Sequence, residues 1–517
     1  MQNTINLSPR EYQQRIFETA KDNNTLVVLP TGLGKTLIAL MLSIHRLKQH
    51  PLSKILFLAP TRPLIEQHFE TYKAQLPELF ADLQLFTGSV PASQRKKIFQ
   101  TAEIIFSTPQ CIANDLDHYL YDMKDISLLI IDEAHRCLKS YDYTKVVDYF
   151  KRQSNNPLIL GLTASPGHDP DKVKEICKHL DIQEIEIRTR DSSDVKQYLQ
   201  EREFEKIEVP FPPEFAELRV LLRRIYDSRV DQLKSRNILF GPANKITLLK
   251  LQARLAQQVS KQNWQAMHGM SLCAQAIKIS HAQELLETQT LSGLNDYIGN
   301  LVEQANNKQT KAVQTLISLP EFQALRISLA NLIKNNIEHP KLAKIKELVE
   351  SEINTNPNAK LILFANFRET AQAISNLLNQ NPKIKSSVFI GQAKKTTKSG
   401  TSGLNQKEQK AIIEKFKSNE LNVLVATSIG EEGLDIPEVS AVIFYEPVPS
   451  AIRKIQRAGR TARLSKGKLL ILVTTDTRDE IHHYASAARE KKMHKTIESI
   501  KQDLKLKKAH PTLNKFK

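Results

Sequence analysis

Short apolar runs rich in β-branched residues recur in two stretches of the chain, and helical spacing separates them. Runs that are apolar on both faces and alternate with helices indicate buried parallel strands, because the helices then cover both faces of the sheet. Each stretch is therefore predicted to form an α/β domain with a parallel sheet. The runs lie at 25–30, 54–60, 103–109, 128–135 and 158–166 in the first stretch, and at 360–367, 386–392, 422–428, 441–447 and 467–474 in the second.

Residues 214–338, between the two stretches, contain few strand-like runs and follow helical spacing, which predicts an all-helical insert of about four or five helices. Proline-containing segments at 209–215 and 339–341 mark its two ends, because proline disfavours helix in the residue before it. The only tryptophan, Trp264, lies in this insert. A core position is expected for Trp264, and a surface for stacking nucleobases is the alternative.

Two polar segments stand apart from these domains. Residues 393–406 are rich in glycine and serine, which predicts a mobile loop or insertion. From Arg489 to Lys517 the chain has ten basic and three acidic residues. A solvated basic helix with a tail and a tail that contacts phosphate groups agree equally well with this composition.

Basic residues outnumber acidic residues by 73 to 56, which gives the chain a formal net charge of +17. Such an excess suggests a polyanionic partner, most often nucleic acid. The four cysteines include no CxxC pair, which argues against a zinc site or a disulfide framework and fits a reducing compartment. No signal peptide is recognisable, and Pro30, Gly32 and Lys35 interrupt the most apolar window, so no membrane span is expected. The expected location is intracellular, and cytoplasmic with nucleoid association in a prokaryote.

The sequence LPTGLGKT at 29–36 follows the first apolar run and precedes an amphipathic helix pattern, which is the setting of a phosphate-binding loop. Its glycines let backbone N–H groups converge on phosphate oxygens at the positive end of the following helix. Lys35 is expected to reach the β- and γ-phosphates of ATP, and Thr36 to ligate Mg²⁺. The usual pattern has glycine where Leu29 stands, and a glycine-rich turn leading into a core helix is the alternative. The predicted nucleotide-binding residues here are Thr31, Gly32, Leu33, Gly34, Lys35 and Thr36.

The sequence IIDEAH at 130–135 ends the fourth apolar run. A parallel strand would bring its carboxylates to the edge of the sheet at which ligands bind in doubly wound folds. Asp132 is therefore expected to hold Mg²⁺, and Glu133 to orient or deprotonate an attacking water. A helix-capping acidic pair is the alternative. Hydrolysis of the γ-phosphate is the favoured reaction.

The sequence QRAGRTAR at 456–463 places three arginines at intervals of three residues, along one face of a helix. This stripe could point Arg460 and Arg463 across a cleft at the nucleotide held by the first domain, where an arginine stabilises charge that develops on the γ-phosphate. ATP would then draw the two domains together, and hydrolysis would release them. A solvated arginine-rich face is the alternative for this segment alone.

Together these motifs, with TAS at 163–165 and ATSIGEEGLDIP at 426–437, resemble those of superfamily-two helicases in order and spacing. DEAHR, GLTASPG, GLNQKEQKAIIEKF and the helical insert are similar to the archaeal Hef and eukaryotic FANCM branch, over nearly the whole chain. The resemblance implies an ATP-dependent DNA helicase or translocase that moves 3′-to-5′ on forks and Holliday junctions, in replication-fork repair and recombination. Nothing after residue 475 resembles the nuclease or helix-hairpin-helix parts of archaeal Hef proteins, so no nuclease activity is inferred.

The resemblance also implies the domain organisation. The fold class is α/β, with two RecA-like parallel-sheet motor domains and an all-helical insert between them. The expected ranges are 1–210 for the first motor domain, 211–338 for a thumb-like DNA-binding insert, 339–488 for the second motor domain and 489–517 for a basic helix and tail.

The family's residue roles carry over by position. Gln13 resembles the glutamine that reads adenine, with Arg10 nearby, and Asp435 resembles a residue that faces the nucleotide across the cleft. Gln456 resembles a glutamine near the γ-phosphate. The implied catalytic residues are Lys35, Glu133, Gln456, Arg460 and Arg463, and those that couple hydrolysis to domain movement are His135, Thr163 and Ser165.

Contacts to the nucleic-acid backbone are likewise implied, at Thr61, Arg62, Thr108, Arg368 and Thr427. Hydroxyls and arginines suit contacts to phosphate oxygens, which carry no information about the base sequence. A translocase needs such contacts because it must bind DNA of any sequence. Relatives often have QRRGRTGR, so Ala458 and Ala462 depart from the pattern, which puts a contact at 458 in doubt. The insert adds clustered cations, either as a grip on duplex DNA or as a solvated helix face: Arg219, Arg223, Arg224, Arg229, Lys234 and Arg236.

Two other functions compete with this interpretation. RIG-I-like proteins and Dicer share the motor branch and act on double-stranded RNA, although no RNA-binding module or zinc site is visible here. A nucleic-acid-binding protein that uses ATP as a switch is the second alternative, and the intact Glu133 with two arginines favours turnover over a switch. Expected cofactors are ATP and Mg²⁺; branched DNA is the expected partner, with a nuclease or sliding clamp acting in trans as a further candidate.

Overall fold

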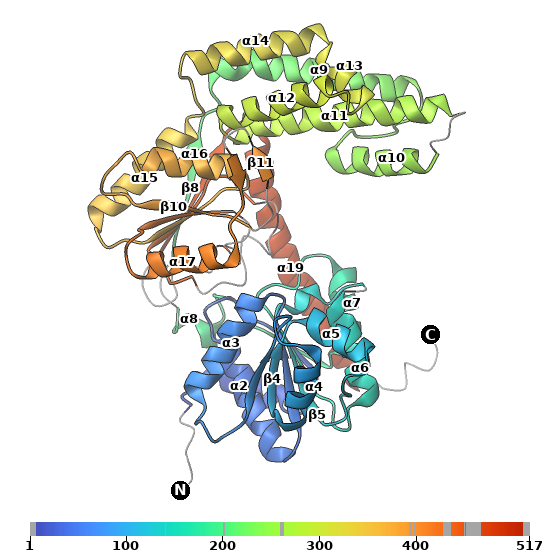
Figure 1. Ribbon diagram of the computed structural model, residues 1–517, viewed down its shortest axis with the longest axis vertical. Coiled ribbons are helices and arrows are strands. Elements are labelled where there is room, and N and C mark those ends of the chain that lie inside the picture. Colours follow the sequence, from blue (N-terminus) through green and yellow to red (C-terminus); the bar gives the residue numbers. More distant parts are fainter. Residues whose placement is uncertain are drawn as a thin grey trace.

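The computed structural model describes residues 7–139, 141–199, 202–258, 263–391, 395–397, 400–427, 436–448, 450, 457 and 467–509. Figure 1 shows two α/β lobes, a helical insert beside the second lobe, and a long helix, α19, that runs from the second lobe to the first. The first lobe contains β1–β7, the second lobe contains β8–β10 and β13–β15, and the insert contains α9–α14. The predicted fold class is therefore confirmed: two parallel sheets with a helical insert between them in the sequence.

The first sheet has the strand order β3-β4-β2-β5-β6-β1-β7, and all of its pairs are parallel. Its central strands are buried on both faces, which accounts for their continuous apolar runs. The strands are β1 (Thr25–Val28), β2 (Lys54–Leu58), β3 (Leu83–Phe86), β4 (Ile104–Ser107), β5 (Ile126–Ile131), β6 (Ile159–Thr163) and β7 (Glu184–Ile187). The helices around it are α1 (Glu11–Ala20), α2 (Lys35–Gln49), α3 (Arg62–Gln75), α4 (Ala92–Thr101), α5 (Pro109–Asp117), α6 (Asp142–Gln153), α7 (Pro170–His179) and α8 (Ser193–Lys196).

The second sheet has the order β10-β13-β9-β14-β15-β8, also with parallel pairs. The series β13-β9-β14-β15 corresponds to β4-β2-β5-β6 of the first sheet, so the architecture is duplicated although the sequences are not. The strands are β8 (Arg202–Val209), β9 (Leu361–Phe364), β10 (Ser386–Phe389), β13 (Val423–Ala426), β14 (Ala441–Phe444) and β15 (Gly467–Thr474). The helices are α15 (Lys341–Thr355), α16 (Arg368–Leu378) and α17 (Gln406–Lys417).

Strand β8 corrects one expected boundary. It lies inside the range 1–210 expected for the first motor domain, yet all eight of its residues pair with β15 of the second sheet. Ile207 and Val209 point into the core of the second lobe, while Phe204 is half exposed, as suits a strand at a sheet edge. The chain therefore enters the second lobe before it enters the insert.

The insert has six helices among the residues that the structure describes, more than the four or five expected. Helix α13 is short and lies close to α12 in the sequence, which accounts for the lower number of helices expected. Apolar side chains from α9, α11, α12 and α14 form the main core of the bundle. The helices are α9 (Ala216–Ser235), α10 (Lys245–Gln258), α11 (Trp264–Thr288), α12 (Leu291–Asn306), α13 (Lys311–Ile317) and α14 (Pro320–Lys334).

Helix α19 (Arg478–Ala509) contains the described part of the basic segment 489–517, for which a solvated helix with a tail and a phosphate-contacting tail agreed equally well with the composition. It starts directly after β15, and its later part docks on the first lobe, where Met493, Ile497 and Ile500 are buried in the core that covers the first sheet. The boundary at residue 489 thus divides one continuous helix. Residues 510–517 lie outside the described residues.

Within the segment 393–406, predicted as a mobile loop or insertion, the structure describes an antiparallel hairpin of β11 (Lys395–Thr397) and β12 (Gly400–Ser402), which is compatible with an insertion. One smaller expectation is wrong. Trp264, expected in the core, has 63% of its surface exposed. Among the helices of the described residues, none has the length and apolar character needed to cross a bilayer.

Candidate active site

Three neighbouring strands of the first sheet bring the predicted nucleotide-binding segments together. In the order β5-β6-β1, the carboxyl ends lead into IIDEAH, TAS and LPTGLGKT respectively. Because parallel strands end at the same edge of a sheet, the three segments share one edge. This adjacency cannot be read from the sequence, in which the segments lie far apart.

The glycine-rich loop between β1 and α2 has the backbone that the sequence predicts. Gly32 and Gly34 have positive φ angles of 85° and 72°, which glycine adopts without steric cost. A Cβ atom on Gly34 would lie 2.4 Å from Gln13 Nε2, so alanine there would displace the Gln13 amide from its contacts with the loop. Lys35 begins α2, and its Nζ donates to the carbonyl of Leu29 at 2.9 Å. The hydroxyl of Thr31 is buried and has no hydrogen-bond partner among the described residues.

Helix α1 holds this loop from one side. The amide of the buried Gln13 donates to the carbonyl oxygens of Leu33 at 3.2 Å and Gly34 at 3.4 Å. Tyr12 donates its hydroxyl to the same Leu33 oxygen at 2.8 Å and accepts a hydrogen bond from Arg10. The structure thus brings Gln13 and Arg10 to the loop, and adds Tyr12, which the motif comparison did not single out.

His68 of α3 joins the two predicted Mg²⁺ ligands. Its Nδ1 lies 3.3 Å from the hydroxyl of Thr36, and its Nε2 lies 2.8 Å from Asp132 Oδ2. Burial acts to raise the pKa of Asp132, but the hydrogen bond and charge of His68, with the charge of Lys35, hold that pKa below its usual value. The carboxylate therefore stays ionised. No motif in the sequence points to His68, because its contact depends on how α3 packs.

Glu133 directly follows Asp132 in a left-handed backbone conformation with φ 52°, which is uncommon for a residue other than glycine. Its Oε2 lies 3.2 Å from His135 Nδ1, which in turn lies 3.3 Å from Thr163 Oγ1. Thr163 Oγ1 accepts from the backbone N–H of Ser165 at 3.1 Å. Ser165 donates its hydroxyl to the sulfur of Met493 at 2.7 Å. A continuous series of contacts thus leads from Glu133 to α19.

The residues present fit a Mg²⁺–nucleotide group. The Thr36 hydroxyl and the ionised Asp132 carboxylate are hard oxygen donors, which Mg²⁺ prefers. They face each other across one histidine, and the unpartnered Thr31 hydroxyl lies in the adjoining loop.

The predicted nucleic-acid contacts lie on a different part of each sheet. Thr61 and Arg62 follow β2, and Thr108 follows the neighbouring β4. The Thr61 hydroxyl is buried without a hydrogen-bond partner among the described residues. In the second lobe Arg368 follows β9 and Thr427 follows the neighbouring β13. The two sets therefore occupy corresponding strand pairs of the two sheets.

One ion pair joins the two lobes beside these residues. Glu66 of α3 accepts from Arg62 Nε at 2.7 Å and from Lys410 Nζ of α17 at 3.0 Å. The Lys410 side chain is mostly exposed, so the pair contributes little to stability.

The arginine stripe of the second lobe is only partly described. Arg457 is fully buried; its guanidinium lies 4.9 Å from the ring centre of Phe364 and 5.9 Å from that of Phe444, and it donates to Asn366 at 3.1 Å. This first arginine of the stripe therefore packs inside the second lobe. Four predicted site residues lie outside the described residues: Asp435, Gln456, Arg460 and Arg463.

Family models match three consecutive parts of the chain. A model described as DEAD/DEAH box helicase matches residues 10–173, and one described as helicase conserved C-terminal domain matches residues 340–465. Between them, residues 214–339 match a model described as the helical bundle of an ATP-dependent RNA helicase.

The crystal structure of the Pyrococcus furiosus Hef helicase domain is similar over 92% of this chain and 98% of that one, with 40% identity and a TM-score of 0.70. The chain belongs to the Hef helicase family. In this Hef-family chain the three matched models cover, in order, the first lobe, the insert and the second lobe.

Curated relatives of this Hef-family chain carry two kinds of name. A protein of Methanocaldococcus jannaschii, named as an ATP-dependent RNA helicase, is 38% identical over 96% of this chain and 61% of its own length. The ATP-dependent DNA helicase mph1 of Neurospora crassa is 35% identical over 91% of this chain and 41% of its own length. The Fanconi anemia group M protein homolog of Mus musculus is 30% identical over 98% of this chain. The chain thus spans 61% or less of the length of these three relatives.

Proposed function

We propose that this chain is an ATP-dependent DNA helicase or translocase that acts on branched DNA, such as forks and Holliday junctions, in replication-fork repair and recombination. The observation that carries this proposal is the shared edge of β5, β6 and β1, with Lys35, Thr36 and Glu133 around one loop. The DNA helicase names among the relatives support DNA as the substrate.

The first lobe would hold the nucleotide. Backbone N–H groups at Gly32 and Gly34 would bind phosphate oxygens, and Lys35 would leave the carbonyl of Leu29 for the β- and γ-phosphates. Gln13, which already grips the loop, would sense whether adenine is bound. Thr36 and Asp132 would hold Mg²⁺, which supplies charge neutralisation on the phosphates when it is bound.

Glu133 would orient the attacking water and accept its proton, because it is the carboxylate not needed to hold the ion. His135, Thr163 and Ser165 would transmit the change at Glu133 to α19 through the contacts described above. Arg460 and Arg463, with Gln456 and Asp435, would complete the site from the second lobe.

The corresponding strand pairs of the two lobes would grip one DNA strand. Thr61, Arg62 and Thr108 in the first lobe, and Arg368 and Thr427 in the second, would contact successive phosphates. Closure of the lobes around ATP would move one set relative to the other, and we propose a 3′-to-5′ direction. The chain would act inside the cell, with a nuclease or sliding clamp as a partner in trans.

The test is ATP hydrolysis and strand separation across a panel of substrates: forks, junctions, linear duplexes, single strands and double-stranded RNA. Forks and junctions are expected to raise kcat at least about tenfold over protein alone, with an effect that weakens as salt increases. Unwinding of a fork with one labelled arm should require hydrolysable ATP. Equal stimulation by every linear substrate would contradict the preference for branched DNA.

Action on double-stranded RNA is the second candidate, because the M. jannaschii relative and the insert model both carry RNA helicase names. Double-stranded RNA that stimulated ATP hydrolysis more strongly than a DNA fork of equal length would favour it. A Glu133→Gln protein that remodelled forks as fast as the parent would instead favour ATP as a switch.

A further inference from the structure

The outer end of the insert presents aromatic side chains to solvent. Trp264 is 63% exposed and Phe240 is 70% exposed. Trp264 begins α11, and the other end of α11 reaches the second lobe, where Glu287 pairs with Arg478 at 3.6 Å. A 25-residue helix is about 37 Å long, so Trp264 lies far from the second lobe, at the end of the insert that carries α10 (Figure 1).

Trp264 is nevertheless held in a fixed position. Asn263 caps α11 by accepting a hydrogen bond from the backbone N–H of Ala266 at 3.0 Å. The indole ring stacks on the imidazole of His268, one helical turn later, with ring centres 5.1 Å apart and planes only 5° apart. Because His268 covers one face of the indole, the large exposed area of Trp264 lies on its other face and edges.

Positive charge surrounds this aromatic pair. Burial, and after it the charges of Arg236 and Arg229, lower the pKa of His268, so the imidazole is neutral at pH 7. Gln265 donates to the carbonyl of Arg236 at 3.5 Å, which joins the start of α11 to the end of α9. The Nε of Arg229 is buried without a hydrogen-bond partner among the described residues.

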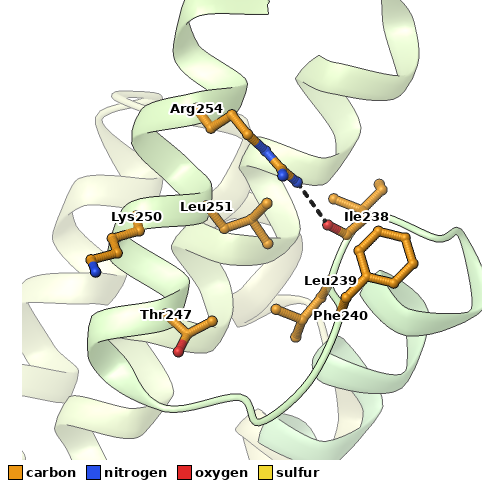
Figure 2. A pocket seen from close by; sticks show the side chains of 7 residues that line it. All are labelled: Ile238, Leu239, Phe240, Thr247, Lys250, Leu251 and Arg254. Carbon is orange, nitrogen blue, oxygen red and sulfur yellow. Dashed lines mark hydrogen bonds between the residues drawn. The ribbon is translucent and has the colours of Figure 1, made fainter.

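The neighbouring surface has the same character. A hollow of about 220 Å³ lies between α10 and the segment 238–240. Figure 2 shows the side chains that line it, with the ring of Phe240 beside it. Lys250 and Arg254 lie on its α10 side, and Arg254 donates to the carbonyl of Ile238 at 3.2 Å. Gly269 of α11 packs against Ile238, which connects this hollow to the helix that carries Trp264.

A flat aromatic surface backed by a second ring and flanked by guanidiniums is how proteins bind unpaired nucleobases. Stacking uses the π-face that all bases share, and the cations contact phosphates on either side. The indole of Trp264 and the imidazole of His268 lie parallel to within 5°, so a third flat ring can continue the same stack on the outer face of the indole.

We propose that Trp264 stacks on an unpaired nucleobase of branched DNA while Arg229 and Arg236 contact the adjacent phosphates. This inference rests on the proposed function and names the part of the substrate that the insert binds: a strand that leaves the duplex at the branch point.

The experiment uses the intrinsic fluorescence of the full chain, because Trp264 is its only tryptophan. A fork with unpaired arms is expected to quench this fluorescence and to protect Trp264 from acrylamide. An otherwise identical fork with abasic arms, and inorganic polyphosphate, should bind with much less quenching because they carry no base to stack. Quenching by polyphosphate equal to that by the fork would overturn the proposal, because a base would then be unnecessary.

Variants supply an independent readout. Trp264→Leu is expected to weaken the affinity for a fork with unpaired arms about tenfold and to leave the affinity for a blunt duplex unchanged, whereas Trp264→Phe should retain most of the difference. The matched control is Tyr119→Leu, at an exposed aromatic of the first lobe. Because Trp264 is exposed, substitutions there should leave the protein folded. Far-UV circular dichroism checks that the variants are folded.

The failure of this inference differs from the failure of the proposed function. If the fork stimulates ATP hydrolysis in the parent and in Trp264→Leu with equal half-saturating concentrations, and fluorescence stays constant throughout, the stacking site is wrong while the helicase assignment stands. If no DNA stimulates hydrolysis, the proposed function itself is wrong.

Discussion

The strands β5 and β14 occupy corresponding places in the two sheets, and each is followed two residues later by a buried glutamate. β5 lies between β2 and β6 and leads to Glu133, and β14 lies between β9 and β15 and leads to Glu446. Glu133 lies beside an ionised Asp132 at the phosphate-binding loop, in a strained backbone conformation. Glu446 accepts the backbone N–H of Asn366.

The surroundings of the two glutamates differ in kind. Burial raises the pKa of Glu446 to about 7, although the charges of Lys341 and Arg457 and the hydrogen bond from Asn366 oppose it. The nearby Lys341 and Asp479 form a fully buried ion pair. One architecture therefore places a carboxyl group at the same strand end twice, once at the edge proposed to bind the nucleotide and once beside a buried ion pair. Position in the fold alone does not assign a catalytic role.

The largest expected difference is in ATP turnover. Glu133→Gln should lower kcat by about 100-fold or more, because an amide cannot accept a proton from water. Glu446→Gln should change kcat by less than about twofold, since the amide keeps the shape and the contact with Asn366. Steady-state ATP hydrolysis at saturating fork DNA measures both. Equal losses in the two variants would remove the distinction between the strand ends.

The second expected effect concerns the glycine-rich loop between β1 and α2 of the first lobe. Gly34→Ala should weaken ATP binding at least about tenfold, because the residue has a positive φ and its new methyl group would displace the Gln13 amide. Gly88→Ala, in the same lobe and with open space around it, is the matched control. Titration with a fluorescent ATP analogue gives the two dissociation constants, and similar constants would contradict this account of the loop.

The third effect is the contribution of Glu446 to the pH dependence of stability. The folded state keeps the proton on Glu446 up to about pH 7, whereas the unfolded chain loses it near the ordinary value of 4.5. The contribution of Glu446 to the free energy of unfolding should therefore fall as pH rises through this interval. Glu446→Gln lacks this fall, so relative to the parent it should gain roughly 1–3 kcal/mol between pH 5 and pH 8. Denaturant unfolding at both values measures it, and a constant difference between the proteins would refute the assignment.

The smallest effect is expected where the two lobes touch. Lys410→Ala removes the exposed partner of Glu66 and should cost less than about 1 kcal/mol of stability. Fork-stimulated ATP hydrolysis should stay within about twofold of the parent, because the pair holds neither the nucleotide nor the sheet edges. A loss of stimulation together with unchanged thermal unfolding would show that this ion pair sets the distance between the lobes.

The sequence predicted the parts of the site that depend on local spacing. Buried strands, the glycine-rich loop and the acidic pair all follow from short patterns, because a strand end and the turn after it are determined within a few residues. Because buried strands are recognised from these short patterns, two similar sheets could be expected even though the sequences of the two lobes are not similar.

The features that were missed depend on packing between distant segments. His68 is an ordinary histidine of an amphipathic helix until α3 places it between Thr36 and Asp132. β8 is mostly polar, with Phe204, Ile207 and Val209 as its apolar residues, and nothing in it specifies which sheet it joins. Arg457 and Trp264 reversed the usual preferences, since the charged side chain is buried and the indole is exposed.

Helix α19 sets a limit on how the protein can be divided. Because Met493, Ile497 and Ile500 complete the hydrophobic core of the first lobe, a chain that ended before them would keep β1–β7 and the nucleotide-binding loop yet leave an uncovered apolar strip. Such a truncated protein would be prone to aggregate. The hydrophobic core of the first lobe therefore includes residues that lie more than 300 positions beyond its last strand.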